Sequence, residues 1–117
     1  MHFYEVNEKL YINTEVIAKY AGIATNECPG VVGMAMLSVQ DGFYRVLKKD
    51  RLQKGVDVKV NENKDLVLTL HIITLYDIRI LEIAERIIKQ VSYVLKEQLG
   101  IEHPIIKVQV EGIKFNN

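Results

Sequence analysis

The fold is decided by residues 55–76, GVDVKVNENKDLVLTLHIITLY, where two segments of alternating side chains flank a polar turn. In the first segment, valines at positions 56, 58 and 60 alternate with polar residues. A period of two is typical of a half-buried β-strand. Residues 61–65, NENKD, supply the asparagine and aspartate that favour tight turns. The stretch therefore predicts a β-hairpin.

The second arm of this hairpin has two unlike faces. The face expected to be buried consists of Leu66, Leu68, Leu70 and Ile72. The other face is only half polar and consists of Val67, Thr69, His71 and Ile73. A domain of 117 residues has limited means to cover a second apolar face. We therefore expect this face to be partly covered, either within the domain or by self-association.

The chain before the hairpin predicts a strand, a helix and another strand. Residues 9–12, KLYI, favour a short strand, and Thr14 is the expected cap of a helix that ends near Cys28. Apolar residues recur at helical spacing in this segment, and Pro29 disfavours helical geometry in the residue before it. Residues 31–39, VVGMAMLSV, predict a strand. Residues 40–54 lack periodicity and predict a loop, with one helical turn near 44–47.

The chain after the hairpin predicts a long helix and a last strand. Asp77 is the expected cap of the helix, whose apolar stripe lies opposite charged residues. Gly100 is expected to end the helix, with Ile101 folding back onto its last turn. Residues 105–113, IIKVQVEGI, alternate as a strand does. The expected order of elements is β-α-β-β-β-α-β.

This order predicts an α+β fold in a single small domain that spans residues 1–117. We expect a mostly antiparallel sheet of about four strands with at least one crossover. Both amphipathic helices are expected to pack on one face of that sheet.

The composition restricts the class of protein. Fifteen basic residues balance fifteen acidic ones, so no global field attracts nucleic acid or an anionic membrane. The N-terminus lacks the basic start and apolar run of a signal peptide, and no apolar stretch approaches the roughly 20 residues of a membrane helix. The single cysteine permits no internal disulfide. We therefore expect a cytoplasmic protein without direct membrane insertion.

Few residues are candidates for catalysis. Cys28 lies at the predicted C-terminal end of a helix, where the helix dipole and Glu27 both oppose a thiolate, so we interpret it as a structural thiol. His71 has no cysteine or carboxylate at ligand spacing, and we interpret it as a satisfied strand residue. The sequence contains no hydrolase, metalloprotease, P-loop or dinucleotide motif. We therefore predict a non-enzymatic protein with no catalytic residue, metal or cofactor.

The best local candidate for partner binding is a basic cluster in the predicted loop. The candidate residues are Phe43, Tyr44, Lys48, Lys49, Arg51 and Lys54. Clustered cations contact phosphate, and aromatic rings stack or anchor. The negative charge of Asp50 reduces the net positive charge of the cluster. The competing interpretation is an ordinary solvated loop. The possible partners are a protein, a lipid headgroup or nucleic acid, although the G-x-x-G at residues 30–33 has valines where a KH loop favours exposed polar residues.

Five segments carry a recognisable family pattern. They are PGVVGM at 29–34, KGVDVKV at 54–60, LVLTLHIITLY at 66–76, EIAERIIKQV at 82–91 and VQVEGI at 108–113. In order and spacing they resemble the alkaline shock protein family, the Gls-type envelope stress proteins of Gram-positive bacteria, over a core from about residue 10 to residue 113. The sequence departs from the family at Asp77, because members commonly have glycine directly after the tyrosine that is Tyr76 here.

The resemblance implies a small cytoplasmic protein linked to envelope homeostasis under alkaline or cell-wall stress. It also implies self-assembly and, as in some members, a place at the inner face of the membrane through a separate membrane-anchored partner protein. No catalytic residue is transferred by the resemblance. The leading hypothesis is a non-enzymatic interaction or scaffolding module, and the alternative is a KH-like RNA-binding module that uses the loop at 48–54.

Overall fold

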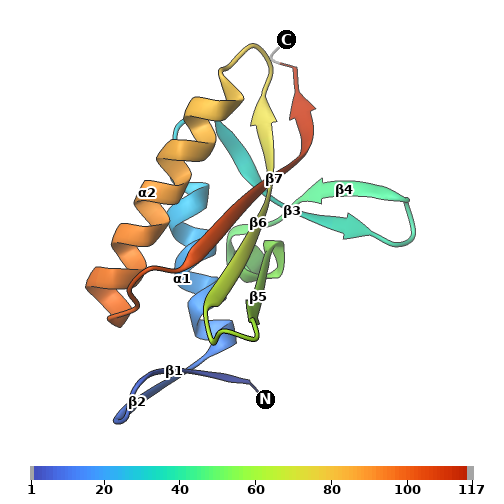
Figure 1. Cartoon of the computed structure of the whole chain (residues 1–117). Coiled ribbons are helices and arrows are strands. Elements are labelled where there is room, and N and C mark those ends of the chain that lie inside the picture. The colour runs from blue at the N-terminus through green and yellow to red at the C-terminus, as the bar shows by residue number, and fades with distance from the viewer. Residues whose placement is uncertain (1, 116–117) are drawn as a thin grey trace.

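The computed structural model describes residues 2–115 of the chain (Figure 1). Its elements, in chain order, are β1 (Phe3–Asn7), β2 (Leu10–Asn13), α1 (Thr14–Asn26), β3 (Val31–Ser38), β4 (Phe43–Val46), the 3-10 segment η1 (Lys49–Gly55), β5 (Val56–Val60), β6 (Leu66–Leu75), α2 (Ile80–Leu99) and β7 (Ile105–Lys114). The expected α+β class is confirmed.

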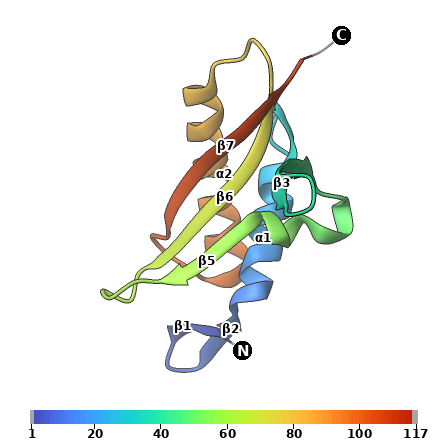
Figure 2. The same ribbon diagram turned by 90° about the vertical axis from the view of Figure 1, so that its right-hand side faces the viewer.

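Strand β6 is the centre of the main sheet. Its one edge pairs in parallel with β7 along residues 67–75. Its other edge is shared, because residues 66–70 pair antiparallel with β5 and residues 72–74 pair antiparallel with β3. Strand β4 pairs with β3, which gives a sheet of five strands. The expected crossover is the connection from β6 through α2 to β7 (Figure 2).

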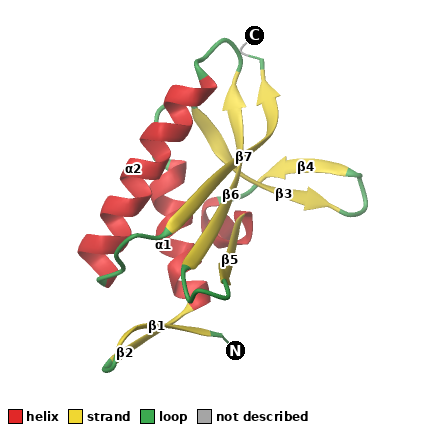
Figure 3. Cartoon of the chain, viewed as in Figure 1, coloured by secondary structure: helices red, strands yellow, loops and turns green. Residues whose placement is uncertain are grey.

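Helices α1 and α2 cover one face of this sheet, as predicted (Figure 3). The predicted buried face of β6 is confirmed, since Leu68, Leu70 and Ile72 have no exposed surface. They pack in one core with Ile17 of α1 and Ile87 of α2, which are equally buried. Every second residue of β6, on the opposite face, is half-buried, as the half-polar pattern predicted.

The helix caps differ from two predictions. Asn13, not Thr14, caps α1, because the Asn13 side-chain oxygen accepts a hydrogen bond from the Glu15 amide at 2.8 Å. Asp77 does not cap α2, which begins only at Ile80; Asp77 lies in the turn before it with φ of 61°. That left-handed conformation is the one that glycine adopts most easily. The C-terminal prediction is confirmed, with Gly100 at φ of 71° and the Ile101 amide donating to the Leu95 carbonyl.

Three further elements were not predicted, and one of them is the 3-10 segment η1, which occupies the second half of the expected loop. The prediction of a helical turn near 44–47 is wrong, because Phe43–Val46 form strand β4 and pair with Ala35–Ser38. Four residues are too few for a period of two to stand out, so the pairing partner defines the strand. Phe3–Asn7 form β1 and pair with β2 in a separate two-stranded hairpin. The turn of that hairpin is held by the Asn7 side chain, which accepts from the Lys9 amide at 2.8 Å.

The core contains one polar atom whose removal is expected to stabilise the fold. Thr74 and Thr25 are both fully buried, and the Thr25 hydroxyl donates to the Ala21 carbonyl at 2.7 Å. The Thr74 hydroxyl oxygen has no hydrogen-bond partner within residues 2–115. We expect Thr74→Val to raise the free energy of unfolding by about 1 kcal/mol, because it removes a desolvated group without a partner.

Thr25→Val is the matched control, and it should lower the free energy of unfolding because it removes a satisfied hydrogen bond. Urea unfolding of both variants, followed by circular dichroism, measures the difference. Equal destabilisation by the two substitutions would show that the Thr74 hydroxyl does have a partner in solution.

Candidate interaction surface

The β3–β4 hairpin projects from the rest of the sheet, on the side away from α2 (Figure 1). It exposes large apolar side chains, which we call the hairpin surface: Met36, Leu37, Val39, Phe43 and Val46. Val39, at the tip, is 89% exposed. By the pairing register, Met36 and Phe43 lie on one face of the hairpin and Leu37 and Val46 lie on the other, so both faces expose apolar side chains. Single exposed apolar residues are ordinary, but several of them on one projecting element are typical of an interaction site.

The hairpin projects because β3 changes partners along its length. Its first half, residues 31–34, pairs with β6 and contains the fully buried Met34. Its second half, residues 35–38, pairs only with β4. β5 occupies the edge of β6 beyond that point, so the outer half of β3 leaves the main sheet. The result is an arm whose strands lie outside the helix-covered core.

The tip of the hairpin is ordered by polar contacts. The Gly42 amide donates to the Ser38 carbonyl at 2.8 Å, with Gly42 at φ of 74°. The Asp41 carboxylate accepts from the Ser38 hydroxyl at 3.1 Å and forms an ion pair with Arg45. The Arg45 guanidinium also lies 5.3 Å from the centre of the Phe43 ring. The charges of the hairpin therefore neutralise each other within it.

A groove of about 320 Å³ separates the hairpin from the outer face of the main sheet. It is lined by Ala35, Met36, Leu37, Val39, Tyr44, Lys54, Asp57 and His71. His71 lies on β6, and the Tyr44 ring of β4 stacks on its imidazole at 6.3 Å between ring centres and 15° between ring planes. This stacking is the contact by which the hairpin reaches the polar centre of the outer face.

His71 is bridged on both sides by carboxylates. Its Nδ1 lies 2.6 Å from Glu111 Oε2, and its Nε2 lies 2.9 Å from Asp57 Oδ2. Gln109 Nε2 donates to the same Glu111 oxygen at 2.7 Å. Burial lowers the pKa of His71, but the hydrogen bonds to Glu111 and Asp57 outweigh burial and raise the pKa above 6.5, its ordinary value. The site therefore favours the imidazolium form.

The comparison with known proteins assigns the chain to a family. Residues 3–115 match the model of the alkaline shock protein family, which is described as having a cell envelope-related function. The chain belongs to this family. It is similar to the uncharacterized protein YloU of Bacillus subtilis (strain 168), with 32% identity over 107 residues that cover 91% of this chain and 88% of the relative. The resemblance found in the sequence is thereby confirmed.

A second relative has a similar match. The uncharacterized protein Spy1614 of Streptococcus pyogenes serotype M6 is 35% identical over 106 residues, which cover 88% of this chain and 85% of the relative. No solved structure matches the chain. The alkaline shock protein family thus gives an envelope-related context, and the names of both relatives assign no role to particular residues.

The structure divides the six predicted binding residues of this alkaline shock family chain between two places. Phe43 and Tyr44 lie on β4, and Lys54, at the end of η1, lines the groove beside Tyr44. Lys48 directly precedes η1 and Lys49 and Arg51 are at its start, and none of the three lines the groove. The aromatic residues therefore belong to the hairpin, whereas three of the four cations lie beside it.

Two parts of this surface were not predicted from the sequence. The apolar residues Met36 and Leu37 were expected in a strand, and nothing in the local pattern indicates that β3 leaves the main sheet between them and Met34. The carboxylate partners of His71 were also missed. Asp57 and His71 face the same side of neighbouring hairpin arms, so the register of that hairpin could have revealed this pair.

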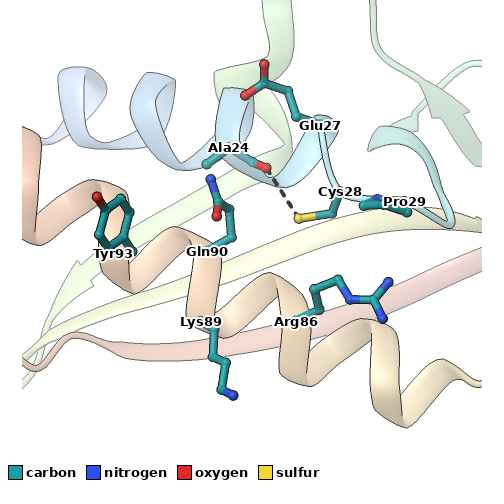
Figure 4. Close-up of a pocket in the computed structure, with 8 residues that line it drawn as sticks. All are labelled: Ala24, Glu27, Cys28, Pro29, Arg86, Lys89, Gln90 and Tyr93. Carbon is teal, nitrogen blue, oxygen red and sulfur yellow. Dashed lines mark hydrogen bonds between the residues drawn. The ribbon is translucent and has the colours of Figure 1, made fainter.

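Cys28 lies in a pocket of about 580 Å³ between the end of α1 and the middle of α2 (Figure 4). The pocket is lined by Ala24, Glu27, Cys28, Pro29, Arg86, Lys89, Gln90 and Tyr93. The buried thiol donates to the Ala24 carbonyl at 3.4 Å. Burial raises the pKa of Cys28, and the Arg86 charge, which lowers it, does not compensate. The pocket therefore holds a protonated thiol rather than an activated nucleophile.

Residues 2–115 contain neither a membrane-spanning helix nor a metal-binding cluster. No helix in that range is long and apolar enough to cross a membrane. The same range contains no group of three or more histidine, cysteine, aspartate or glutamate side chains arranged to hold a metal ion. In the His71 site the two carboxylates lie against different ring nitrogens, on opposite edges of the imidazole. The hairpin surface and the groove behind it are thus the strongest candidate site in the described chain.

Proposed function

We propose that this member of the alkaline shock protein family is a non-enzymatic scaffolding module of the cell envelope stress system, which assembles with further copies of itself through the hairpin surface. The observation that carries the proposal is the exposed apolar cluster on the β3–β4 hairpin. Exposure of these side chains to water does not stabilise the monomer. Their burial in an interface would stabilise the complex by about 25 cal/mol per Å² of apolar area removed from water.

The geometry of the hairpin suits a second copy of the chain. β4 pairs with β3 alone among the described strands, so the backbone groups of its outer edge are available to another strand. Antiparallel pairing of β4 with β4 of a second copy would place identical patches together around a two-fold axis. Asp41 and Arg45 neutralise each other within each hairpin, and the chain has no net charge. Two copies therefore approach without electrostatic repulsion.

The connection to the envelope is proposed to be indirect. In this proposal the protein works in the cytoplasm, and a membrane-anchored partner protein holds its assemblies at the inner face of the membrane. The balance of fifteen basic and fifteen acidic residues provides no net attraction to anionic lipid. RNA binding through residues 48–54 finds no support in the family description or in the relatives.

Sedimentation velocity over a range of concentrations tests the proposed assembly. We expect Leu37→Glu with Phe43→Glu to weaken self-association at least tenfold, because each side chain contributes about 1.5–3 kcal/mol when fully buried. Leu81→Glu with Tyr93→Glu is the matched control, since both side chains are at least as exposed but lie on α2. Circular dichroism verifies that both double variants fold.

The control variant is expected to assemble like the natural chain. A natural chain that stays monomeric up to about 1 mM would contradict the proposed self-assembly. Equal weakening by the two double variants would place the interface elsewhere on the molecule.

A further inference from the structure

The contacts of His71 specify its protonation state. A neutral imidazole has one N–H donor and one nitrogen that accepts. Both ring nitrogens of His71 lie within 2.9 Å of a carboxylate oxygen, and a carboxylate only accepts. Both contacts are hydrogen bonds only when both nitrogens carry a proton. The arrangement is therefore complementary to the imidazolium ion and poorly complementary to neutral histidine.

This bridge joins three neighbouring strands on the outer face of the sheet. Asp57 belongs to β5, His71 to β6 and Glu111 to β7. The side chains of His71 and Glu111 are 16% and 11% exposed, whereas that of Asp57 is 60% exposed. Glu111 is accordingly the stronger partner, because water screens the contact with Asp57.

The charged and titratable groups around His71 come from four elements. β5 contributes Asp57, β7 contributes Glu111, β4 contributes Tyr44, and the end of η1 contributes Lys54. The pKa of Tyr44 is raised by burial and by the Glu111 and Asp57 carboxylates, so Tyr44 stays neutral. The two negative charges of the carboxylates are then balanced by the positive charges of the Lys54 ammonium and the His71 imidazolium. Loss of the imidazolium proton leaves the group with a net negative charge.

We propose that the Asp57–His71–Glu111 bridge is a pH-responsive latch that holds the β3–β4 hairpin against the outer face of the main sheet through Tyr44. When His71 loses a proton, one ring nitrogen presents a lone pair to a carboxylate oxygen less than 3 Å away, and that contact opens. Tyr44 then stacks on a neutral ring whose position is less well defined. The hairpin becomes more mobile as the pH rises.

The direction of the effect follows from linkage. The pKa of His71 is higher in the folded chain than its ordinary value of 6.5. The stabilisation by the bridge is therefore complete below about pH 6.5 and is lost as the pH rises through the folded pKa. Asp57 and Glu111 must be ionised for the bridge to form, so it also weakens at strongly acidic pH.

The test is an NMR pH titration of the dilute, monomeric chain. The His71 ring signals report the proton, and the Tyr44 ring and the β4 amide signals report the hairpin. We expect His71 to titrate above pH 6.5 and the hairpin signals to change with the same midpoint. In His71→Gln, which has no titrating ring, the hairpin signals should be constant from about pH 6 to about pH 9. Hairpin signals that ignore the His71 titration in the natural chain would overturn the latch.

Two further variants keep the test informative if His71→Gln folds poorly. Glu111→Gln and Asp57→Asn each remove one carboxylate charge, and both should lower the His71 midpoint. The shift should be larger for Glu111→Gln, because Glu111 is the more buried partner. Midpoints unaffected by either substitution would overturn the bridge itself.

The latch rests on the proposed function only for its effect on assembly. If the hairpin surface is the interface, the association constant should fall by about fivefold between about pH 6 and pH 9 in the natural chain and stay constant in His71→Gln. A chain whose hairpin responds to pH but that never associates supports the latch and refutes the proposed self-assembly. A chain that associates equally at all pH values and whose hairpin signals do not change with pH supports the proposed self-assembly and refutes the latch.

Discussion

Replacing Gly30 by alanine is expected to lower the free energy of unfolding by about 2–3 kcal/mol. Gly30 has φ of 90°, a conformation that costs a residue with a side chain roughly 1–2 kcal/mol. An added Cβ would also lie 2.5 Å from Cδ1 of Ile83, a core residue of α2. The terminal methyl of Ile83 would have to turn away from the new Cβ within the core, which adds about 1 kcal/mol.

The position of Gly30 explains why the turn cannot relax easily. Its carbonyl accepts a hydrogen bond from the Leu75 amide of β6 at 3.1 Å, so the turn between α1 and β3 is fixed to the central strand. Urea unfolding followed by circular dichroism measures the change in free energy.

Gly42→Ala is the matched control, because Gly42 has a similar φ of 74° but no atom within 4 Å of an added Cβ. It should cost about 1 kcal/mol from backbone strain alone. Equal losses for the two substitutions would mean that Ile83 accommodates the methyl group without cost.

The second large effect is expected in the alkylation of Cys28 by iodoacetamide. We predict that the folded chain reacts roughly 100-fold more slowly at about pH 8 than the chain unfolded in guanidinium chloride, because the attacking species is the thiolate. Cys28 is 6% exposed, and its thiol donates to the Ala24 carbonyl. Burial also raises its pKa, so both access and ionisation are reduced in the folded chain.

An exposed cysteine in the same fold provides the control. Gln40→Cys in a Cys28→Ala background places a thiol in the exposed turn of the β3–β4 hairpin, and its reaction should be nearly as fast as in the unfolded chain. Mass spectrometry follows both reactions. If folded Cys28 reacts as fast as the thiol introduced at position 40, the Cys28 pocket opens readily and its thiol again becomes a candidate nucleophile.

The parts of the fold that were predictable from the sequence are those with a long repeating pattern. Leu66, Leu68, Leu70 and Ile72 identify the central strand because a buried face requires a period of two over the whole segment. Gly100 ends α2 as predicted because glycine readily takes the left-handed conformation that closes a helix in this way. Strand β4 was not predictable, since four residues are identified as a strand only by their pairing with β3.

The candidate site shows the same division. Phe43 and Tyr44 were singled out because aromatic side chains in a polar stretch are conspicuous, and the structure places both on β4 of the hairpin. Glu111 was not connected with His71, from which it is separated by 40 residues in the chain. Their contact depends on the parallel pairing of β6 with β7, which is a tertiary feature that no local pattern contains.

The change of partner along β3 has a consequence for how this protein can vary. Residues 31–34 are bound to β6 and are constrained by the core, whereas residues 35–38 pair only with β4. A substitution such as one at Leu37 or Phe43 therefore changes the exposed surface of the arm without disturbing the packing that keeps the domain folded. One strand thus combines a segment held by the core with a segment whose exposed side chains can change while the scaffold stays the same.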